Sequence, residues 1–214
     1  MYQWAAGPAP AGRDALRHAA VLAAGRPGDC RCRQWRCNVL YDKKLDFLYA
    51  HGPPHRAREP RIIRTGLPGF RLRFYPGVPE DARAELKAFA RWLRREVDFR
   101  HPVLVTVVPQ ATVMGHDGPA GWAVFVIPPA DHSPADVVRI YLGAGAMRVM
   151  ETVYGYGRSA ALAKVLHDLA HEVVHYEQWR DGRPVTERGV NRRAAALVRR
   201  YAASKPALAQ AVAA

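Results

Sequence analysis

Three histidines at four-residue intervals lie in the segment 167–179, HDLAHEVVHYEQW. The second and third, His171 and His175, form an H-E-x-x-H motif together with Glu172. On an α-helix, residues four apart lie one above the other, about 6 Å apart along the axis. Both imidazoles can therefore reach one metal ion, since zinc–nitrogen bonds are about 2.0–2.1 Å long.

Glu172 directly follows the first of these two histidines and is turned from it by about 100° around a helix axis. Its carboxylate is therefore expected beside a water molecule on the metal, and not on the metal itself. A metal ion lowers the pKa of such a water toward neutrality, and a neighbouring carboxylate can take its proton. The motif predicts metal-assisted hydrolysis with Glu172 as the catalytic base.

A catalytic zinc takes three protein ligands, so one more is required from elsewhere in the chain. Glu187 lies 12 residues after His175, beyond a helix break at Asp181-Gly182, at the start of a second predicted helix. A reversal of the chain there would bring Glu187 back against the first helix. Asn191, four residues further on, could then hydrogen-bond a ligand histidine.

The stretch HEVVHYEQW…DGRPVTERGVNRRA resembles gluzincin-type zinc metallopeptidases. The resemblance covers about residues 120–203 and extends to small bacterial and phage zincins of the SprT-like and minimal gluzincin groups. It implies a zincin-like fold, one Zn²⁺ ion on His171, His175 and Glu187, and hydrolysis of a peptide or protein substrate. The family often has E-x-x-x-D on the second helix, where this chain has Glu187 and Asn191, so a neutral amide replaces an orienting carboxylate.

The surrounding residues leave several roles open. His167 is interpreted as a capping or pocket-wall residue, or as a proton donor on the substrate side, because three stacked imidazoles cannot all reach one ion. Asp168 either bonds the ring of His171 or faces solvent. The donor to the developing oxyanion cannot be chosen from the sequence, and the candidates are Tyr154, Tyr156, Tyr201, His132 and Arg188.

Periodicity predicts the elements that must position these residues. The fold class is α+β, with helices on one side of a small antiparallel or mixed sheet, ending in the active-site helix and a second C-terminal helix. The resemblance implies that a strand beside the active helix, either 121–128 or 137–142, pairs with an extended peptide substrate; the alternative is that these are covered core strands. Strands are predicted at 61–66, 70–77, 102–109, 121–129 and 136–145, and helices at 79–97, 158–180 and 186–203.

The domain organisation follows from composition. Residues 1–60 are basic and rich in proline, glycine and arginine, and they are expected to be loosely ordered, with a short helix over 12–25. Residues 61–205 are predicted to form the metallopeptidase domain and residues 206–214 a C-terminal tail. The spacing of Cys30, Cys32 and Cys37 fits either plain reduced thiols, a second metal site or a redox role.

The net charge of +13 is unevenly distributed, with +10 on residues 1–100 and +3 on the remainder. This charge favours either a solvated surface or a nucleic-acid partner. The alternative function is therefore a basic nucleic-acid-associated protein with a structural zinc site, or a protease recruited to DNA; a phage structural or lysis component with a zincin fold is a third. No signal peptide or membrane span is apparent, so a cytoplasmic location without a membrane partner is expected.

Overall fold

The computed structural model describes residues 55–56, 69–115, 120–129, 132–133 and 135–213. The region 1–60 lies almost entirely outside these ranges, as do the three cysteines, the helix expected over 12–25 and the strand expected at 61–66.

The main sheet is mixed and has four strands in the order β2-β3-β7-β6. Strands β2, β3 and β7 are parallel, and β6 runs antiparallel at one edge. The bounds are Gly69–Phe74 for β2, Pro102–Val108 for β3, Val138–Gly143 for β7 and Ala123–Val126 for β6. A smaller sheet joins β1 (His55–Arg56), β4 (Val113–Met114) and β5 (Ala120–Gly121).

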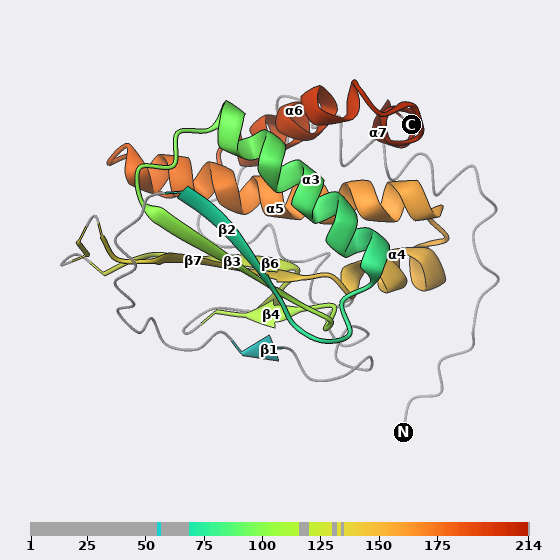
Figure 1. The fold of residues 1–214 in the computed structure, drawn as a ribbon, viewed down its shortest axis with the longest axis horizontal. Coiled ribbons are helices and arrows are strands. Elements are labelled where there is room, and N and C mark those ends of the chain that lie inside the picture. The colour runs from blue at the N-terminus through green and yellow to red at the C-terminus, as the bar shows by residue number, and fades with distance from the viewer. Residues whose placement is uncertain (1–54, 57–68, 116–119, 130–131, 134, 214) are drawn as a thin grey trace.

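Helices α3 and α5 cover one face of the four-stranded sheet, and α6 and α7 pack beyond them (Figure 1). The predicted α+β class with a small mixed sheet is therefore confirmed. No helix in the described part of the chain is both long enough and apolar enough to cross a bilayer. The helices are α3 (Glu80–Glu96), α4 (Ala146–Tyr154), α5 (Arg158–Arg180), α6 (Val190–Ala202) and α7 (Pro206–Ala213).

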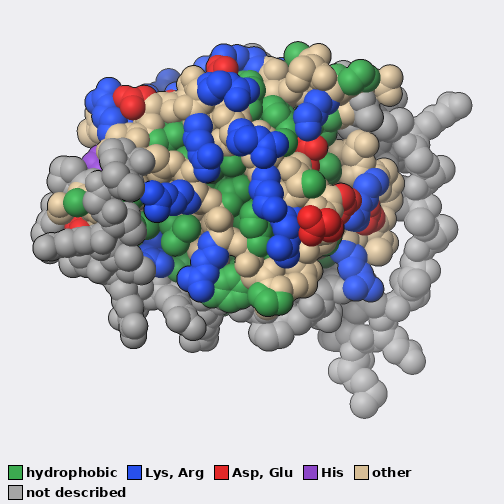
Figure 2. Space-filling model, in the orientation of Figure 1, with side chains coloured by type: hydrophobic (Ala, Val, Ile, Leu, Met, Phe, Trp, Pro, Cys, Tyr) green, Lys and Arg blue, Asp and Glu red, His purple; other side chains and the backbone are tan. Residues whose placement is uncertain are grey.

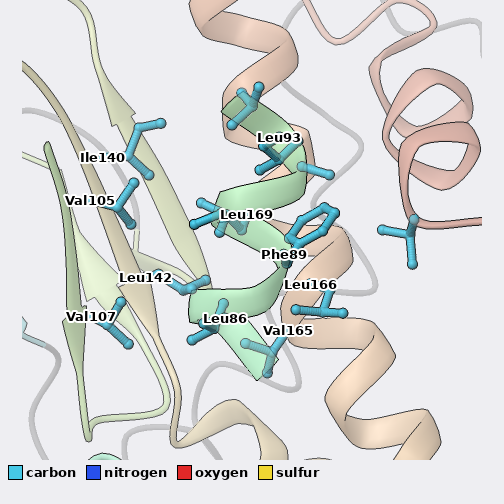
Figure 3. Packing of buried hydrophobic residues seen from close by; sticks show 14 of the residues in the cluster. Leu86, Phe89, Leu93, Val105, Val107, Ile140, Leu142, Val165, Leu166 and Leu169 are labelled. Carbon is cyan, nitrogen blue, oxygen red and sulfur yellow. The ribbon is translucent and has the colours of Figure 1, made fainter. Parts of the chain in front are cut away.

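The core lies between the sheet, α3 and α5. Helix α3 begins after Pro79, with acidic residues in its first turn, as expected for a helix start. Its apolar stripe places Leu86, Phe89 and Leu93 in the interior, all fully buried. These side chains meet residues of β3, β7 and α5, so one continuous apolar layer fixes the long helix against the sheet (Figure 3).

Helix α5 is buried on more than one side, since the sheet, α4, α6 and α7 all contact it. Its apolar side chains, such as Leu166, Leu169 and Val173, are fully buried. Polar Glu172, His175 and Gln178 are buried as well. Buried polar groups are costly unless they are hydrogen-bonded, so α5 must bring partners to these positions.

Three expectations about the elements differ from the structure. Helix α6 begins at Val190 and not at 186, because Gly189 adopts a left-handed conformation with φ 77° that interrupts a helix. Helix α4 was not predicted, and Pro206–Ala213, expected as a tail, form α7 against α5 and α6. Strand β7 is paired on both sides, so residues 137–142 are wrong as a peptide-binding edge, and β6 is the outer strand.

Replacing Leu86 by alanine tests the packing of α3 between sheet and helix. We expect a loss of about 2–5 kcal/mol in the free energy of unfolding, because a fully buried leucine leaves a cavity. Urea unfolding followed by circular dichroism measures it. The control is Lys87→Ala at the adjacent exposed position, expected to change stability by less than about 0.5 kcal/mol; equal effects of the two substitutions would contradict this packing.

Candidate metal centre

His171 and His175 lie one turn apart on α5 with their rings facing each other. The ring centroids are 4.7 Å apart at an interplanar angle of 72°, and the two Nε2 atoms are 3.0 Å apart. Both rings sit in the well-packed middle of the helix, where the apolar neighbours of α5 hold the backbone. The helix thus directs two potential ligand nitrogens to one point.

Glu187 reaches the same point from the loop that follows α5. The helix ends at Arg180, and Gly182 adopts a left-handed conformation that turns the chain back. The carboxylate of Glu187 then lies 3.2 Å from the Nε2 atom of His171 through Oε2 and 3.2 Å from that of His175 through Oε1. Among the described residues, these three are the group whose ligand atoms converge in the way a metal ion requires.

The spacing of these atoms fits a tetrahedral ion. Zinc bonds of about 2.0–2.1 Å place tetrahedral ligand atoms about 3.3 Å from one another. The observed separations are 3.0, 3.2 and 3.2 Å. Two imidazoles and one carboxylate are a donor set that catalytic zinc takes, and the 69% exposure of the Glu187 side chain leaves the site open to solvent on one side.

The outward-facing nitrogen of each ring has an amide partner. The Nδ1 atom of His171 lies 2.9 Å from Oδ1 of Asn191, and the Nδ1 atom of His175 lies 3.0 Å from Oε1 of Gln178. Hydrogen bonds of this kind orient a ligand ring and select its tautomer. Asn191 therefore makes the hydrogen bond to a histidine ring that the sequence predicted. Glu187, however, precedes α6 and does not share a helical face with Asn191.

Charges within the cluster shift its acid–base equilibria. Burial opposes a proton on His171, but hydrogen bonding to Glu187 and the nearby charge of Glu172 outweigh it and raise the pKa of His171 to about 9. The pKa of His175 is raised in the same way. Hydrogen bonds from both histidines hold the pKa of Glu187 well below its usual range. The site therefore attracts positive charge, whether protons or a cation.

Glu172 points toward the sheet edge beside the cluster. It is buried, and its Oε2 atom accepts a hydrogen bond of 2.7 Å from the backbone N–H of Phe125 on β6. Burial raises the pKa of Glu172, while the two histidines and this hydrogen bond oppose the shift. Its carboxylate is thus held at the outer strand, close enough to His171 and His175 for their charges to act on it.

His167 and Asp168 form a separate pair one turn before the cluster. The ring of His167 lies 6.5 Å from that of His171, and its Nδ1 atom is 3.9 Å from Oδ1 of Asp168. Asp168 forms an ion pair with Lys164, so it neither bonds the ring of His171 nor stands free in solvent. Burial opposes its ionisation, yet Lys164 and His167 hold its pKa below the usual value.

The candidate tyrosines lie away from the cluster. Tyr201 donates its hydroxyl to Glu85 and packs on Phe89 and Trp92, at the interface of α3 and α6. Tyr154 and Tyr156 precede Arg158, which is 13 residues, or about 20 Å of helix, before His171. The structure therefore brings none of the three to the site.

The other two oxyanion candidates are His132 and Arg188, and no hydrogen bond or ion pair joins either to the cluster among the contacts of the described residues. His132 is buried beside Trp179 and Asp136, with ring centroids 5.2 Å apart in the first pair. Arg188 follows Glu187 and is exposed.

Two partners in this site were not expected from the sequence. Gln178 carries a usable signal, because a residue three positions after a histidine on a helix can reach its ring. The N–H of Phe125 could not be predicted from the sequence. Almost every residue has a main-chain N–H, and whether this one meets Glu172 depends on how β6 is placed beside α5.

Comparison of the chain with protein-family models, with curated proteins and with solved structures gives no match. What the site can do must therefore be argued from its own geometry.

Metal binding can be measured directly on the purified protein. We expect one equivalent of Zn²⁺ in the wild type and a strong loss of affinity in Glu187→Ala, because that variant keeps two of three ligands. Competition with a chromophoric chelator gives both values. Glu80→Ala, which removes a highly exposed carboxylate, is the control; equal zinc affinity in both variants would remove Glu187 from the ligand set.

Proposed function

We propose that this protein is a zinc-dependent peptidase of the gluzincin type, with a zincin-like active site. The observation that carries the proposal is the convergence of His171, His175 and Glu187 on one point, with the buried carboxylate of Glu172 beside it. A structural zinc site ordinarily has four protein ligands, whereas this one has three and opens to solvent. That difference favours catalysis over a purely structural role.

Each residue of the site has a separate proposed role. A zinc ion bound there would lower the pKa of water and polarise a carbonyl group. His171, His175 and Glu187 would hold it, and Asn191 and Gln178 orient the two rings.

Glu172 is the proposed general base. Its Oε2 atom accepts a hydrogen bond from the N–H of Phe125, and its other oxygen, Oε1, would take the proton of the attacking water. The proton taken there passes to the leaving amine. The raised pKa of Glu172 suits a group that must both accept and return a proton near neutral pH.

The outer strand β6 supports a peptide as the substrate class. An extended peptide can add to a free sheet edge through main-chain hydrogen bonds. Strand β6 forms one edge of the four-stranded sheet in the described part of the chain. There the N–H of Phe125 is taken by Glu172, so a paired peptide would lie beside this carboxylate and would not bond that N–H. A peptide paired along β6 would therefore carry its carbonyl groups past the proposed base.

The variant Glu172→Gln separates metal binding from catalysis. Glutamine has the same shape and can still accept the hydrogen bond from Phe125, so fold and zinc content should be retained. Hydrolysis of a casein or fluorogenic peptide substrate should fall by about 10²–10⁴-fold, since no base remains. The neighbouring Glu177→Gln is the matched control, and undiminished hydrolysis by Glu172→Gln would exclude Glu172 as the base.

A second candidate function is nucleic-acid binding, either instead of or together with proteolysis. Lys and Arg side chains gather on the face that α3 presents in Figure 2. On α3 they recur at four-residue intervals, whereas Glu85 and Glu96 pair with Lys205 and Arg200 of the C-terminal part. The basic side chains of the stripe are Arg83, Lys87, Arg91 and Arg95.

Charge reversal on this stripe tests the second candidate. The double variant Lys87→Glu/Arg91→Glu should bind duplex DNA more weakly, and its plot of log affinity against log salt should be less steep by about 0.9 for each lost phosphate contact. Fluorescence anisotropy at several salt concentrations gives both quantities. Arg148→Glu on α4 is the control for charge reversal away from the stripe and should be compared with the single variant Arg91→Glu, which changes the net charge equally; absence of binding by the wild type at low salt would contradict the candidate.

A further inference from the structure

Gln178 is a buried polar residue whose contacts extend beyond the ring of His175 that it orients. It lies one turn after His175 on α5, with 7% of its surface exposed. Its side chain makes three hydrogen-bond contacts: Oε1 with Nδ1 of His175 at 3.0 Å, Oε1 with the backbone N–H of Thr186 at 3.2 Å, and Nε2 with the backbone carbonyl of Thr186 at 2.9 Å. Thr186 is the residue immediately before the proposed ligand Glu187.

The two contacts with Thr186 fix which way the amide of Gln178 points. A backbone N–H only donates and a backbone carbonyl only accepts. A flipped amide would place its NH₂ against the N–H of Thr186 and its oxygen against the carbonyl oxygen. The orientation with Oε1 toward His175 is therefore determined by the main chain of the loop.

An oxygen facing Nδ1 of His175 requires a hydrogen on that nitrogen. In the neutral imidazole the other nitrogen, Nε2, then carries the lone pair. This is the atom that lies 3.0 Å from Nε2 of His171 and 3.2 Å from Oε1 of Glu187. The loop backbone thus selects, through one amide, the tautomer of His175 that can bind a metal.

The same amide also holds the loop that delivers Glu187. The backbone carbonyl of Gln178 accepts a hydrogen bond of 2.9 Å from the N–H of Arg183, and its side chain ties down Thr186. Gln178 therefore fastens the loop to α5 at two points, Arg183 and Thr186.

We propose that Gln178 is a positioning residue which couples two ligands of the metal centre, setting the tautomer of His175 and anchoring the loop that carries Glu187. The inference deepens the proposed metal site and rests on it for its effect on zinc. Gln178 itself does not touch the ion or the substrate.

Two substitutions separate hydrogen bonding from packing. Gln178→Met keeps the length of the side chain but removes the acceptor, so the zinc dissociation constant should rise about 10–100-fold. Gln178→Glu keeps an oxygen that accepts from His175 and from the N–H of Thr186, but sets its second oxygen against the Thr186 carbonyl. It should therefore keep the proton of neutral His175 on Nδ1 while holding the loop less firmly. Wild-type zinc affinity in Gln178→Met, or a proton on Nε2 of neutral His175 in Gln178→Glu, would overturn the proposal. Glu177→Gln, one position earlier, is the control and should leave the affinity unchanged.

Measurements without metal keep this test independent of the zinc proposal. In the metal-free wild type, at a pH where His175 is neutral, ¹⁵N NMR should find its proton on Nδ1, and the Thr186 amide should be protected from hydrogen exchange. Both signatures should weaken in Gln178→Met. A proton on Nε2 in the wild type, or an unprotected Thr186 amide, would overturn the positioning role. If both signatures hold but no zinc binds, the proposed function fails while the positioning role stands.

Discussion

The need to satisfy polar groups buried on α5 determines how the rest of the site is assembled. Glu172, His175 and Gln178 lie in the interior of a helix that is packed on several sides. Each would destabilise the fold if left without a partner. Their partners come from outside the helix or from one another: the N–H of Phe125 on β6, the main chain of Thr186, and the ring of His175. Strand, helix and loop are therefore tied together by the residues that we propose to carry the chemistry.

The cluster of His171, His175 and Glu187 favours a cation through its charge as well as through its geometry. Glu187 stabilises positive charge on both histidines, which raises the pKa of His171 to about 9. A cation that enters must displace such protons, so its binding is coupled to their release. Near neutral pH, the two outward hydrogen bonds favour deprotonated Nε2 atoms once an ion replaces the proton. The arrangement that attracts protons in the absence of a metal is thus the one that suits a divalent ion.

Much of the fold and part of the site could be predicted from the sequence because both depend on local periodicity. The stripe of α3 follows from the 3.6-residue repeat, the end of α5 follows from the break at Asp181-Gly182, and H-E-x-x-H fixes the spacing of His171 and His175. Glu187 was predicted from the break at Asp181-Gly182, although the start of α6 was placed too early because Gly189 also interrupts the helix. The roles of residues far from the motif were harder to predict. Tyr201 shares α6 with Asn191 but faces α3, and no local sequence pattern gives that direction. The interior place of β7 likewise depends on strand order, which periodicity does not contain.

The contact between Glu172 and β6 joins the proposed base to the proposed substrate edge. One oxygen of the carboxylate is held at 2.7 Å by a main-chain N–H of the outer strand, on the side of β6 that faces away from β7. The carboxylate of Glu172 on α5 therefore lies directly beside the strand that a peptide would join. The proposed chemistry depends on where a few side chains and one main-chain N–H are placed. Different folds can provide the same placement, so the proposal does not require similarity over the whole chain.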